Sequence, residues 1–273
     1  MLIAVSRVQK RVFWSSRLKS HERIGPHNLN IISLIVGSLL SSSYLEKRSH
    51  LSSIRIILIK YSNNAEYLMW FHLMLAKAGY CSYKRPKLHK LIGKGNKVFF
   101  FYILKSYSFS SFTWLFSLFY INNQKTIPKN IDEYLTPLAL ATLFLSSVWA
   151  DEKAIFKSQP TLNIPLSVSQ VNGLNTLSQV LKIKCKIDTE INNNSGFNSG
   201  SLHIKNSSRA AFIKMVHPHI LSSQVHLLKR PTLKLTFFGA PQFIRCLATL
   251  PDFDNSVRES KRKLRKEYVL SLE

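Results

Sequence analysis

The sequence has few acidic residues. Fourteen Asp and Glu stand against 38 Lys and Arg, which gives a formal net charge of +24. The shortage is sharpest in residues 1–130, which hold 20 basic residues but only Glu22, Glu46 and Glu66. A compact fold with this imbalance repels itself unless a polyanion relieves it. Together with 11% aromatic residues, the charge favours nucleic acid as the partner. A basic surface that serves only solubility is the alternative, and a membrane surface comes third.

Cysteine and long apolar runs are also scarce. The three cysteines, Cys81, Cys185 and Cys246, lie far apart and form no metal-ligand spacing, so neither a zinc site nor a disulfide framework is predicted. The apolar run Ile31–Ser42 is shorter than the roughly 20 residues that span a bilayer. The aromatic run Val98–Ile121 is interrupted by Lys105 and by serines. No membrane partner is therefore expected.

The two ends of the chain are basic. Residues 1–24 carry six Lys/Arg, four Ser and one acid, a composition typical of an organelle-targeting segment. A basic nucleic-acid-binding arm is the alternative interpretation. Residues 229–273 form a C-terminal extension, and its segment "SVRESKRKLRKEYVLSL" is typical of a charged helix suited to a phosphate backbone or a protein partner. The alternative interpretation is a helix whose charged face is simply solvated.

Between these ends, hydrophobic periodicity predicts alternating helices and strands. The expected helices are 31–42, 64–79, 110–123, 137–147, 169–181 and 209–216. The expected strands are 51–59, 98–109, 154–156, 182–187 and 202–205, with a basic hairpin-like segment at 84–97. Two segments, 25–130 and 131–228, each start with a short apolar helix that ends in serines and continue as α+β, which predicts an internal duplication.

Several segments of this sequence resemble the LAGLIDADG homing endonuclease and intron maturase family. They include "IGPHNLNIISLIVGSLLSSSYLEKRS", "SNNAEYLMWFHLMLAKAGYCS", "RPKLHK", "GKGNKVFFFYI" and "SYSFSSFTWLFSLFY". The most specific is "TIPKNIDEYLTPLALATLF". The resemblance runs from about Gly25 to Leu228 and weakens after residue 150.

The resemblance implies an α+β fold of two pseudo-symmetric units, each with an antiparallel β saddle that grips a duplex. The units would pack through two central motif helices, Ile31–Ser42 and Pro137–Ser147. Small residues such as Gly37, Ser38, Ala141 and Thr142 would let the two backbones approach closely.

In active relatives each motif helix ends in an acid, and the two carboxylates bind Mg²⁺ that activates water and stabilises the leaving oxygen. Here the acid positions map to Ser42 and Ser147. A neutral hydroxyl is a poor ligand for Mg²⁺, which prefers charged oxygens. We therefore expect no catalytic residues, no metal and no cofactor. The alternative is that Glu46, or Asp151 and Glu152, serve as displaced metal ligands. Only in that case would the protein bind Mg²⁺.

The preserved saddles are expected to bind phosphate through Lys and Arg. The candidate nucleic-acid-binding residues are Arg55, Lys60, Lys84, Arg85, Lys87, Lys90, Lys94, Lys97, Lys105, Lys153 and Lys157. The segment 84–97 is the densest part of this set, with an ordinary solvated loop as its alternative. Tyr61, Tyr83 and Tyr102 are candidates for stacking on bases or sugars.

These observations lead to the hypothesis of a catalytically inactive LAGLIDADG-type protein that binds structured RNA in a mitochondrion, with a plastid as the alternative. The RNA would be a group I intron, assisted in splicing, or ribosomal RNA, with the C-terminal extension contacting ribosomal proteins. Duplex DNA is a further possible partner. The competing hypotheses are a DNA homing endonuclease with displaced metal ligands and a remnant without function.

Overall fold

The computed structural model describes residues 18–23, 26–48, 53–62, 65–92, 98–148, 168–192, 199–229 and 233–238. Five of its helices are α2 (Leu29–Leu39), α3 (Ala65–Lys77), α5 (Pro137–Val148), α7 (Val168–Cys185) and α8 (Arg209–Val216). A shorter helix, α4 (Thr113–Phe119), follows the 3₁₀ turn η3 (Ser110–Phe112), and a longer 3₁₀ segment, η8 (Ser222–Lys229), follows α8.

The strands form antiparallel sheets. The first sheet has the order β1-β2-β4-β3, from β1 (Tyr44–Arg48), β2 (Ser53–Tyr61), β4 (Val98–Lys105) and β3 (Leu88–Ile92). The second has the order β7-β8-β9, from β7 (Thr189–Asn192), β8 (Ser199–Ile204) and β9 (Lys234–Phe238). A small hairpin joins β5 (Tyr120–Ile121) to β6 (Gln124–Lys125). The predicted α+β class with antiparallel sheets is confirmed.

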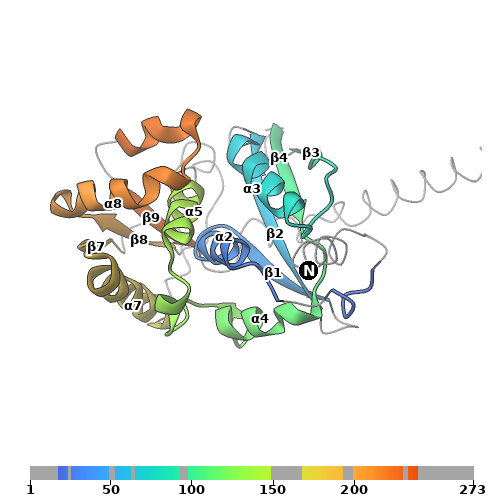
Figure 1. The fold of residues 1–273 in the computed structure, drawn as a ribbon, viewed down its shortest axis with the longest axis horizontal. Helices are drawn as coiled ribbons and strands as arrows, with labels where there is room; N and C mark the ends of the chain where they lie inside the picture. The colour runs from blue at the N-terminus through green and yellow to red at the C-terminus, as the bar shows by residue number, and fades with distance from the viewer. Residues whose placement is uncertain are drawn as a thin grey trace, which may run out of the picture. The chain divides into compact units, whose positions relative to one another are not determined.

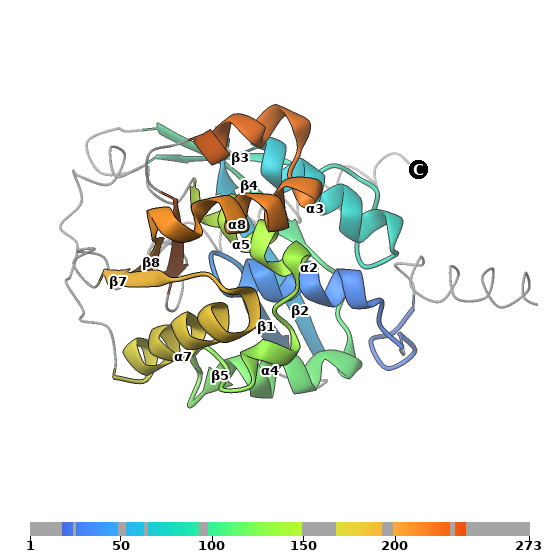
Figure 2. The same ribbon diagram turned by 60° about the vertical axis from the view of Figure 1, so that its left-hand side comes forward.

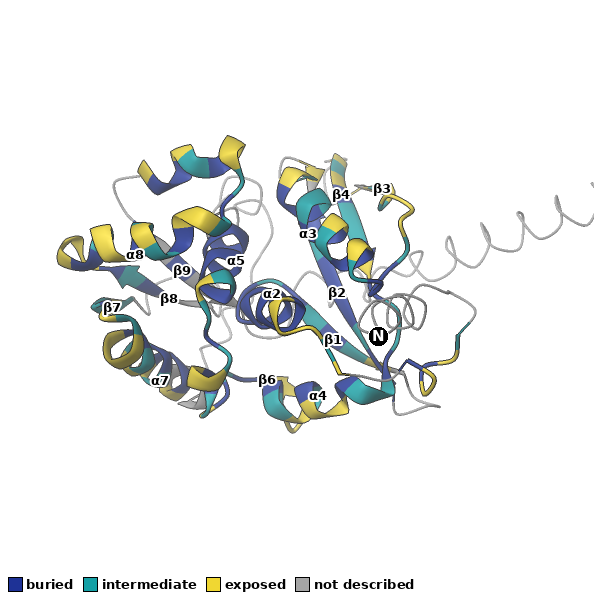
Figure 3. Ribbon diagram, viewed as in Figure 1, coloured by how far each residue is buried: buried dark blue, intermediate teal, exposed yellow. Residues whose placement is uncertain are grey.

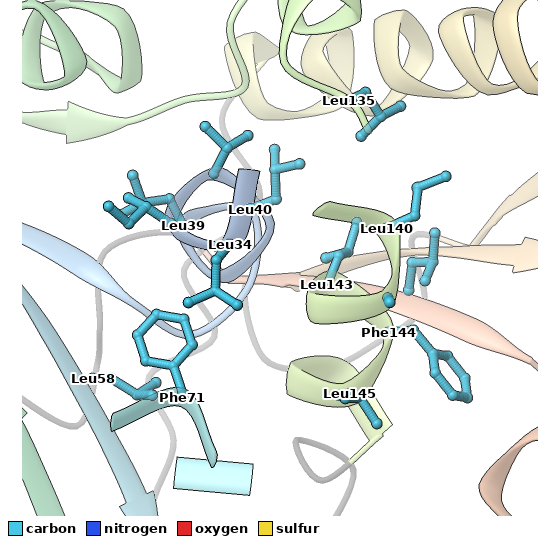
Figure 4. Close-up of a cluster of buried hydrophobic side chains, with 14 of the residues drawn as sticks. Leu34, Leu39, Leu40, Leu58, Phe71, Leu135, Leu140, Leu143, Phe144 and Leu145 are labelled. Carbon is cyan, nitrogen blue, oxygen red and sulfur yellow. The ribbon is translucent and has the colours of Figure 1, made fainter. Parts of the chain in front are cut away.

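Helices α2 and α5 lie side by side at the centre, between the two larger sheets (Figure 1). Their close approach depends on Gly37, because a Cβ atom there would lie 2.2 Å from the backbone oxygen of Ala139 and 2.9 Å from the Cβ of Thr142. Leu34 of α2 points toward Phe71 of α3, while Phe144 of α5 points away from α2 (Figure 4). The two helices thus connect the apolar contacts of both halves in one core.

Burial follows this arrangement. Helix α2 is buried from Ile31 to Leu39, and the central ribbons are dark blue in Figure 3, whereas α7 and α8 turn an exposed side outward. This explains why the motif helices are apolar almost all round, as a helix without a solvent face must be. None of the described helices has the length and apolarity to cross a membrane.

Most expected elements are present, with boundaries shifted by a few residues. The expected strand at 182–187 is wrong, because Lys182–Cys185 form the last turn of α7. Lys186 then adopts a positive φ of 55° and the strand begins only at Thr189. The expected strand at 154–156 lies outside the described residues.

The boundaries of the two ends also differ from the sequence analysis. Residues 234–238, assigned to the C-terminal extension, form β9 and complete the second sheet, where Leu235 is fully buried. Near the other end, Arg23 is buried, donates a hydrogen bond of 2.7 Å to the Ser108 oxygen and lies over the Tyr107 ring. Figure 2 brings the left-hand side of Figure 1 forward, so that β7 and β8 of the second sheet are seen beside α7. Residues 1–17 and the charged C-terminal segment lie outside the described residues.

Candidate functional site at the ends of the motif helices

Helix α2 ends in a tight turn that presents its serines. The backbone N–H groups of Ser41 and Ser43 both donate to the Ser38 oxygen, at 3.1 and 3.0 Å. The Ser38 hydroxyl donates to the Ile35 oxygen at 2.9 Å. Serine hydroxyls that bond to nearby backbone groups in this way compete with helix continuation. The turn leads directly into β1 at Tyr44.

At the ends of the motif helices, Ser42 meets Ser146 of α5, with 2.7 Å between their hydroxyl oxygens. Ser147, the other position mapped from the family motif, turns away and donates to the Leu143 oxygen of its own helix at 2.6 Å. The two positions mapped from the family motif therefore have different hydrogen-bond partners in this chain. We call Ser41, Ser42, Ser43, Ser146 and Ser147 the serine site.

Two buried lysines contact this site. Lys60 of β2 donates to the Ser146 backbone oxygen at 2.9 Å, and its residue is only 6% exposed. Lys125 of β6 donates to the backbone oxygens of Ser41 and Ser43, both at 2.8 Å, and is 5% exposed. Burial lowers the pKa of each ammonium to about 7, because the charged form loses its hydration. A cation near carbonyl oxygens at a helix C-terminus is electrostatically favourable.

Lys125 was not among the site residues predicted from the sequence. It reaches the site because Asn122 and Asn123 both have positive φ, 51° and 59°, at the tip of the β5–β6 hairpin. Consecutive positive φ values are typical of a type I′ turn, which Asn tolerates better than most residues. The signal was present in "INNQK", where an Asn pair stands between two short strands.

The serine site does not fit Mg²⁺. Its side chains supply neutral hydroxyls, and the lysines beside it are cationic donors, whereas Mg²⁺ takes charged oxygen ligands. Among the described residues, no group of three or more His, Cys, Asp or Glu could hold a metal ion. Glu46, considered as a displaced ligand, is paired with Arg55, which lies opposite it across β1 and β2. Asp151 and Glu152 lie outside the described residues.

The expected nucleic-acid contacts are only partly brought together. Exposed side chains are found at Lys84, Arg85, Lys87, Lys90 and Lys105. Lys60 was wrongly placed in this set: it lies five positions from Arg55 on β2, so the two side chains point to opposite faces of the sheet, and Lys60 faces the core. Lys94, Lys97, Lys153 and Lys157 lie outside the described residues.

The strand register shows which of the predicted nucleic-acid-binding residues lie on the same face of the first sheet. Arg55 and Lys105 lie on the same face of the first sheet, since Ile57 pairs with Lys105 and alternates with Arg55. That face also carries Ile57 and Phe101, both nearly fully buried yet outside the main core cluster. Lys90 pairs with Phe100 and lies on the other face. Tyr83 is exposed and Tyr102 is half-buried. The side chain of Tyr61 lies outside the described residues.

The arrangement of a central helix pair flanked by antiparallel sheets is that of a LAGLIDADG-type α+β protein. The structure of the homing endonuclease I-WcaI bound to its DNA recognition sequence has the same fold, with a TM-score of 0.61 and 17% identity over 78% of this chain and 94% of that one. The model of the LAGLIDADG DNA endonuclease family matches residues 32–212. The chain belongs to this family, which confirms the resemblance found in the sequence.

Two relatives carry a more specific name. Cytochrome b mRNA maturase bI2 of Saccharomyces cerevisiae is 30% identical over 215 residues, which are 76% of this chain and 49% of the relative. The chain thus spans about half the length of that protein. Cytochrome b mRNA maturase bI2 of Debaryomyces hansenii is 24% identical over 227 residues, 79% of this chain and 84% of the relative.

Proposed function

We propose that this chain is a LAGLIDADG-type nucleic-acid-binding protein that does not cleave, and that its ligand is structured RNA. The observation that carries the proposal is the serine site. Ser42 and Ser147 stand where the family resemblance places the carboxylates that strand cleavage requires, and the buried ammonium groups of Lys60 and Lys125 contact the backbone of neighbouring serines. The packing of α2 on α5 is retained without that chemistry, as expected of a chain selected for binding.

The RNA part of the proposal is supported by the relatives that are named mRNA maturases. The group I intron version, in which the protein assists splicing, draws more support from those names than the ribosomal RNA version does. The cytochrome b maturase names and the composition of residues 1–24 support a mitochondrion. We further propose that the two halves of the fold are pseudo-symmetric and present paired saddles to the ligand.

The test is crosslinking of the protein in cells, followed by sequencing of the recovered nucleic acid. Recovery of one intron supports the maturase function, and recovery of ribosomal RNA supports the ribosomal one. Recovery of DNA alone contradicts the proposal.

DNA cleavage is the competing function, favoured by the fold shared with I-WcaI. It is tested by incubating the purified chain with Mg²⁺ and a duplex that spans the intron-insertion site of the host gene. We expect no nicked product. Mg²⁺-dependent nicking that disappears in a Glu46→Gln or an Asp151→Asn/Glu152→Gln variant would assign displaced ligands and reject the non-cleaving proposal.

A further inference from the structure

The β3–β4 hairpin projects beyond the rest of the first sheet. Strand β2 ends at Tyr61, which pairs with Phe101, so the residues of β4 before Phe101 pair only with β3. A two-stranded ribbon is only marginally stable in water unless one of its faces packs against another element. The burial of its two faces therefore indicates where such packing is needed.

One face of the hairpin continues the face of the sheet on which α3 packs. Leu58 of β2 pairs with Leu104 of β4, and Leu58 lies beside Phe71 of α3 in the core (Figure 4). Because side chains alternate along a strand, Phe100 and Val98 lie on the same face as Leu104. This face thus runs out from under α3 along the projecting part of β4.

Strand β3 contributes three residues to the same face. Lys90 pairs with Phe100, Ile92 pairs with Val98, and Leu88 alternates with Lys90 and Ile92 along the strand. We call these five residues the hairpin face: Leu88, Lys90, Ile92, Val98 and Phe100.

The hairpin face is largely apolar and exposed. The exposed fractions are 50% at Leu88, 57% at Ile92, 44% at Val98 and 42% at Phe100. These are four of the ten large hydrophobic residues that are exposed among those the structure describes. On the opposite face of β4, Phe99 is half-buried and Phe101 is nearly fully buried. A contiguous exposed apolar patch of this kind marks an interaction site.

The layering of the first unit leaves room for one more helix over this face. Helix α3 packs against β2 and β4 and makes no comparable contact with β3. Neighbouring strands lie roughly 4.8 Å apart and a helix is roughly 10 Å wide, so one helix covers about two strands. A second helix beside α3 would therefore cover β3 and the projecting part of β4.

The charge around the hairpin face indicates what such a helix carries. Lys90 stands within the face, and Lys84, Arg85 and Lys87 are exposed just before β3. A second copy of this chain would bring these basic side chains against their own counterparts, and the net charge of +24 opposes that association. A partner with acidic residues beside an apolar stripe complements both the charge and the exposed side chains.

From these observations we propose that the hairpin face docks an amphipathic helix of a partner protein, with an apolar stripe over Leu88 and Phe100 and acidic residues beside Lys90. The recognition mode is that of a helix whose apolar side chains recur every three or four residues and anchor it to an apolar surface. The hairpin face lies opposite Arg55 and Lys105 on the sheet. A nucleic acid held by those two residues therefore leaves the hairpin face accessible.

The first experiment measures the binding of designed peptides to the full chain by fluorescence anisotropy. The probe is a hydrocarbon-stapled helical peptide of 13 residues, the length of α3, with leucine along one stripe and glutamate on the remaining surface. One matched peptide carries lysine in place of glutamate, and another has the residues of the probe in an order without a stripe. We expect saturable binding of the acidic striped peptide alone.

The apolar contact is tested with the double variant Leu88→Thr/Phe100→Thr. Threonine suits a strand and both positions are exposed, so the fold is retained. We expect the Kd for the acidic striped peptide to rise by about tenfold or more, because two apolar anchors are lost. The matched control is Ile121→Thr/Ile183→Thr, which changes two exposed isoleucines on β5 and α7 and should bind as the wild type does.

Two further variants keep the proposal falsifiable if Leu88→Thr/Phe100→Thr does not fold. The variant Ile92→Thr/Val98→Thr removes the other two apolar side chains of the hairpin face and should weaken binding as well. Lys90→Glu should exchange the preference, so that the lysine peptide binds more tightly than the glutamate peptide. A merely structural role of Lys90 would not reverse this order.

Several outcomes overturn the proposal. They are no binding of the acidic striped peptide, equal binding of the peptide without a stripe, and equal losses in Leu88→Thr/Phe100→Thr and its control. Dimerisation of the wild type in analytical ultracentrifugation that the same variant abolishes would assign the face to a second copy instead. A loss of affinity for single-stranded RNA in that variant would assign it to RNA bases. The peptide assays contain no RNA, so their failure is distinguishable from a failure of the proposed RNA-binding function.

Discussion

At the scale of single residues, the absence of a side chain matters most at Gly37. A Cβ atom at this position would overlap a backbone oxygen of α5, which cannot move without the whole helix. Small residues were expected along the motif helices. At Gly37 the backbone of α5 lies so close that no side chain fits. Ser38 and Thr142 instead use their hydroxyls to bond within their own helices, at 2.9 and 2.8 Å.

Gly37→Val should therefore separate α2 from α5 and destabilise the whole fold. We expect the free energy of unfolding to fall by more than about 3 kcal/mol, the range of severe overpacking. Urea denaturation measures it. Ser117→Ala, on the exposed side of α4, is the control and should change stability by less than about 0.5 kcal/mol. A Gly37→Val variant as stable as the wild type would show that the two helices can move apart freely.

The buried lysines predict an unusual dependence of stability on pH. Burial lowers the pKa of Lys60 and Lys125 to about 7 in the folded state, whereas an unfolded lysine has a pKa of about 10.4. Between these values the unfolded chain binds more protons than the folded one, so stability rises with pH. Below pH 7 both states are protonated and the two lysines contribute no slope.

We expect the free energy of unfolding to increase from pH 7 toward pH 10, by up to about 1.4 kcal/mol per pH unit for each lysine. Urea denaturation across this range measures the slope. The double variant Lys60→Met/Lys125→Met should show a flatter curve. Equal slopes for the wild type and the double variant would mean that these lysines do not titrate in this window.

At the scale of secondary-structure elements, β9 decides whether the second half has a complete sheet. This strand pairs with β8 from Lys234 to Phe238. Leu233 and Leu235 alternate toward the core, as period-two patterning requires. These residues were predicted to belong to the C-terminal extension, because the family resemblance ends near Leu228. The alternation in "LKLTFF" was the signal for a strand.

Leu235→Asp should disrupt β9, because it buries an unpaired carboxylate at a fully buried position. We expect a loss of more than about 3 kcal/mol in the free energy of unfolding. Leu73→Asp on α3, where the leucine is 44% exposed, is the matched control and should cost less than about 1 kcal/mol. Chemical denaturation followed by circular dichroism distinguishes the two. Similar losses in both variants would place Leu235 outside the stabilising core.

Among the other elements, long periodic segments were predictable and short or ambiguous ones were not. Helix α8 was predicted with the boundaries that the structure has, and α5 differs by one residue. The prediction of a strand at 182–187 was wrong because "LKIKCKI" alternates like a strand. In the structure its first residues continue helix α7, which begins at Val168 and ends at Cys185. Periodicity over six residues cannot separate the two conformations when a neighbouring helix can propagate.

At the scale of the whole molecule, the positive charge leads to a prediction about the proposed binding of RNA. Lys84, Arg85, Lys87 and Lys90 are exposed beside β3 and gather four basic side chains in one segment. Replacing all four with Gln should weaken RNA binding and reduce the dependence of log K on log salt by up to about 0.7–0.9 per lost phosphate contact. Filter binding at several salt concentrations measures both quantities.

The control removes the same number of charges from exposed positions on other elements, at Lys77, Lys129, Lys182 and Lys214. We expect this variant to keep most of its affinity and nearly all of its salt slope. If both variants lose affinity equally, RNA attraction depends on net charge alone and the segment at 84–90 is no specific contact.

The sequence by itself determined the class of this protein, because class depends on periodicity and on a run of matching motif residues. It also places serine at positions 42 and 147, the two positions to which the family resemblance maps the motif acids. Even the error at Lys60 was correctable from sequence, since five positions along a strand reverse the face.

Only the tertiary structure decided which side chains meet at the ends of the motif helices. It brings Ser42 to Ser146 rather than to Ser147, and it buries Lys60 and Lys125 against the ends of the two motif helices. These residues are up to 104 positions apart, so no local pattern records their contact. Their pKa values and their partners follow from burial, which exists only once the helices and sheets have packed.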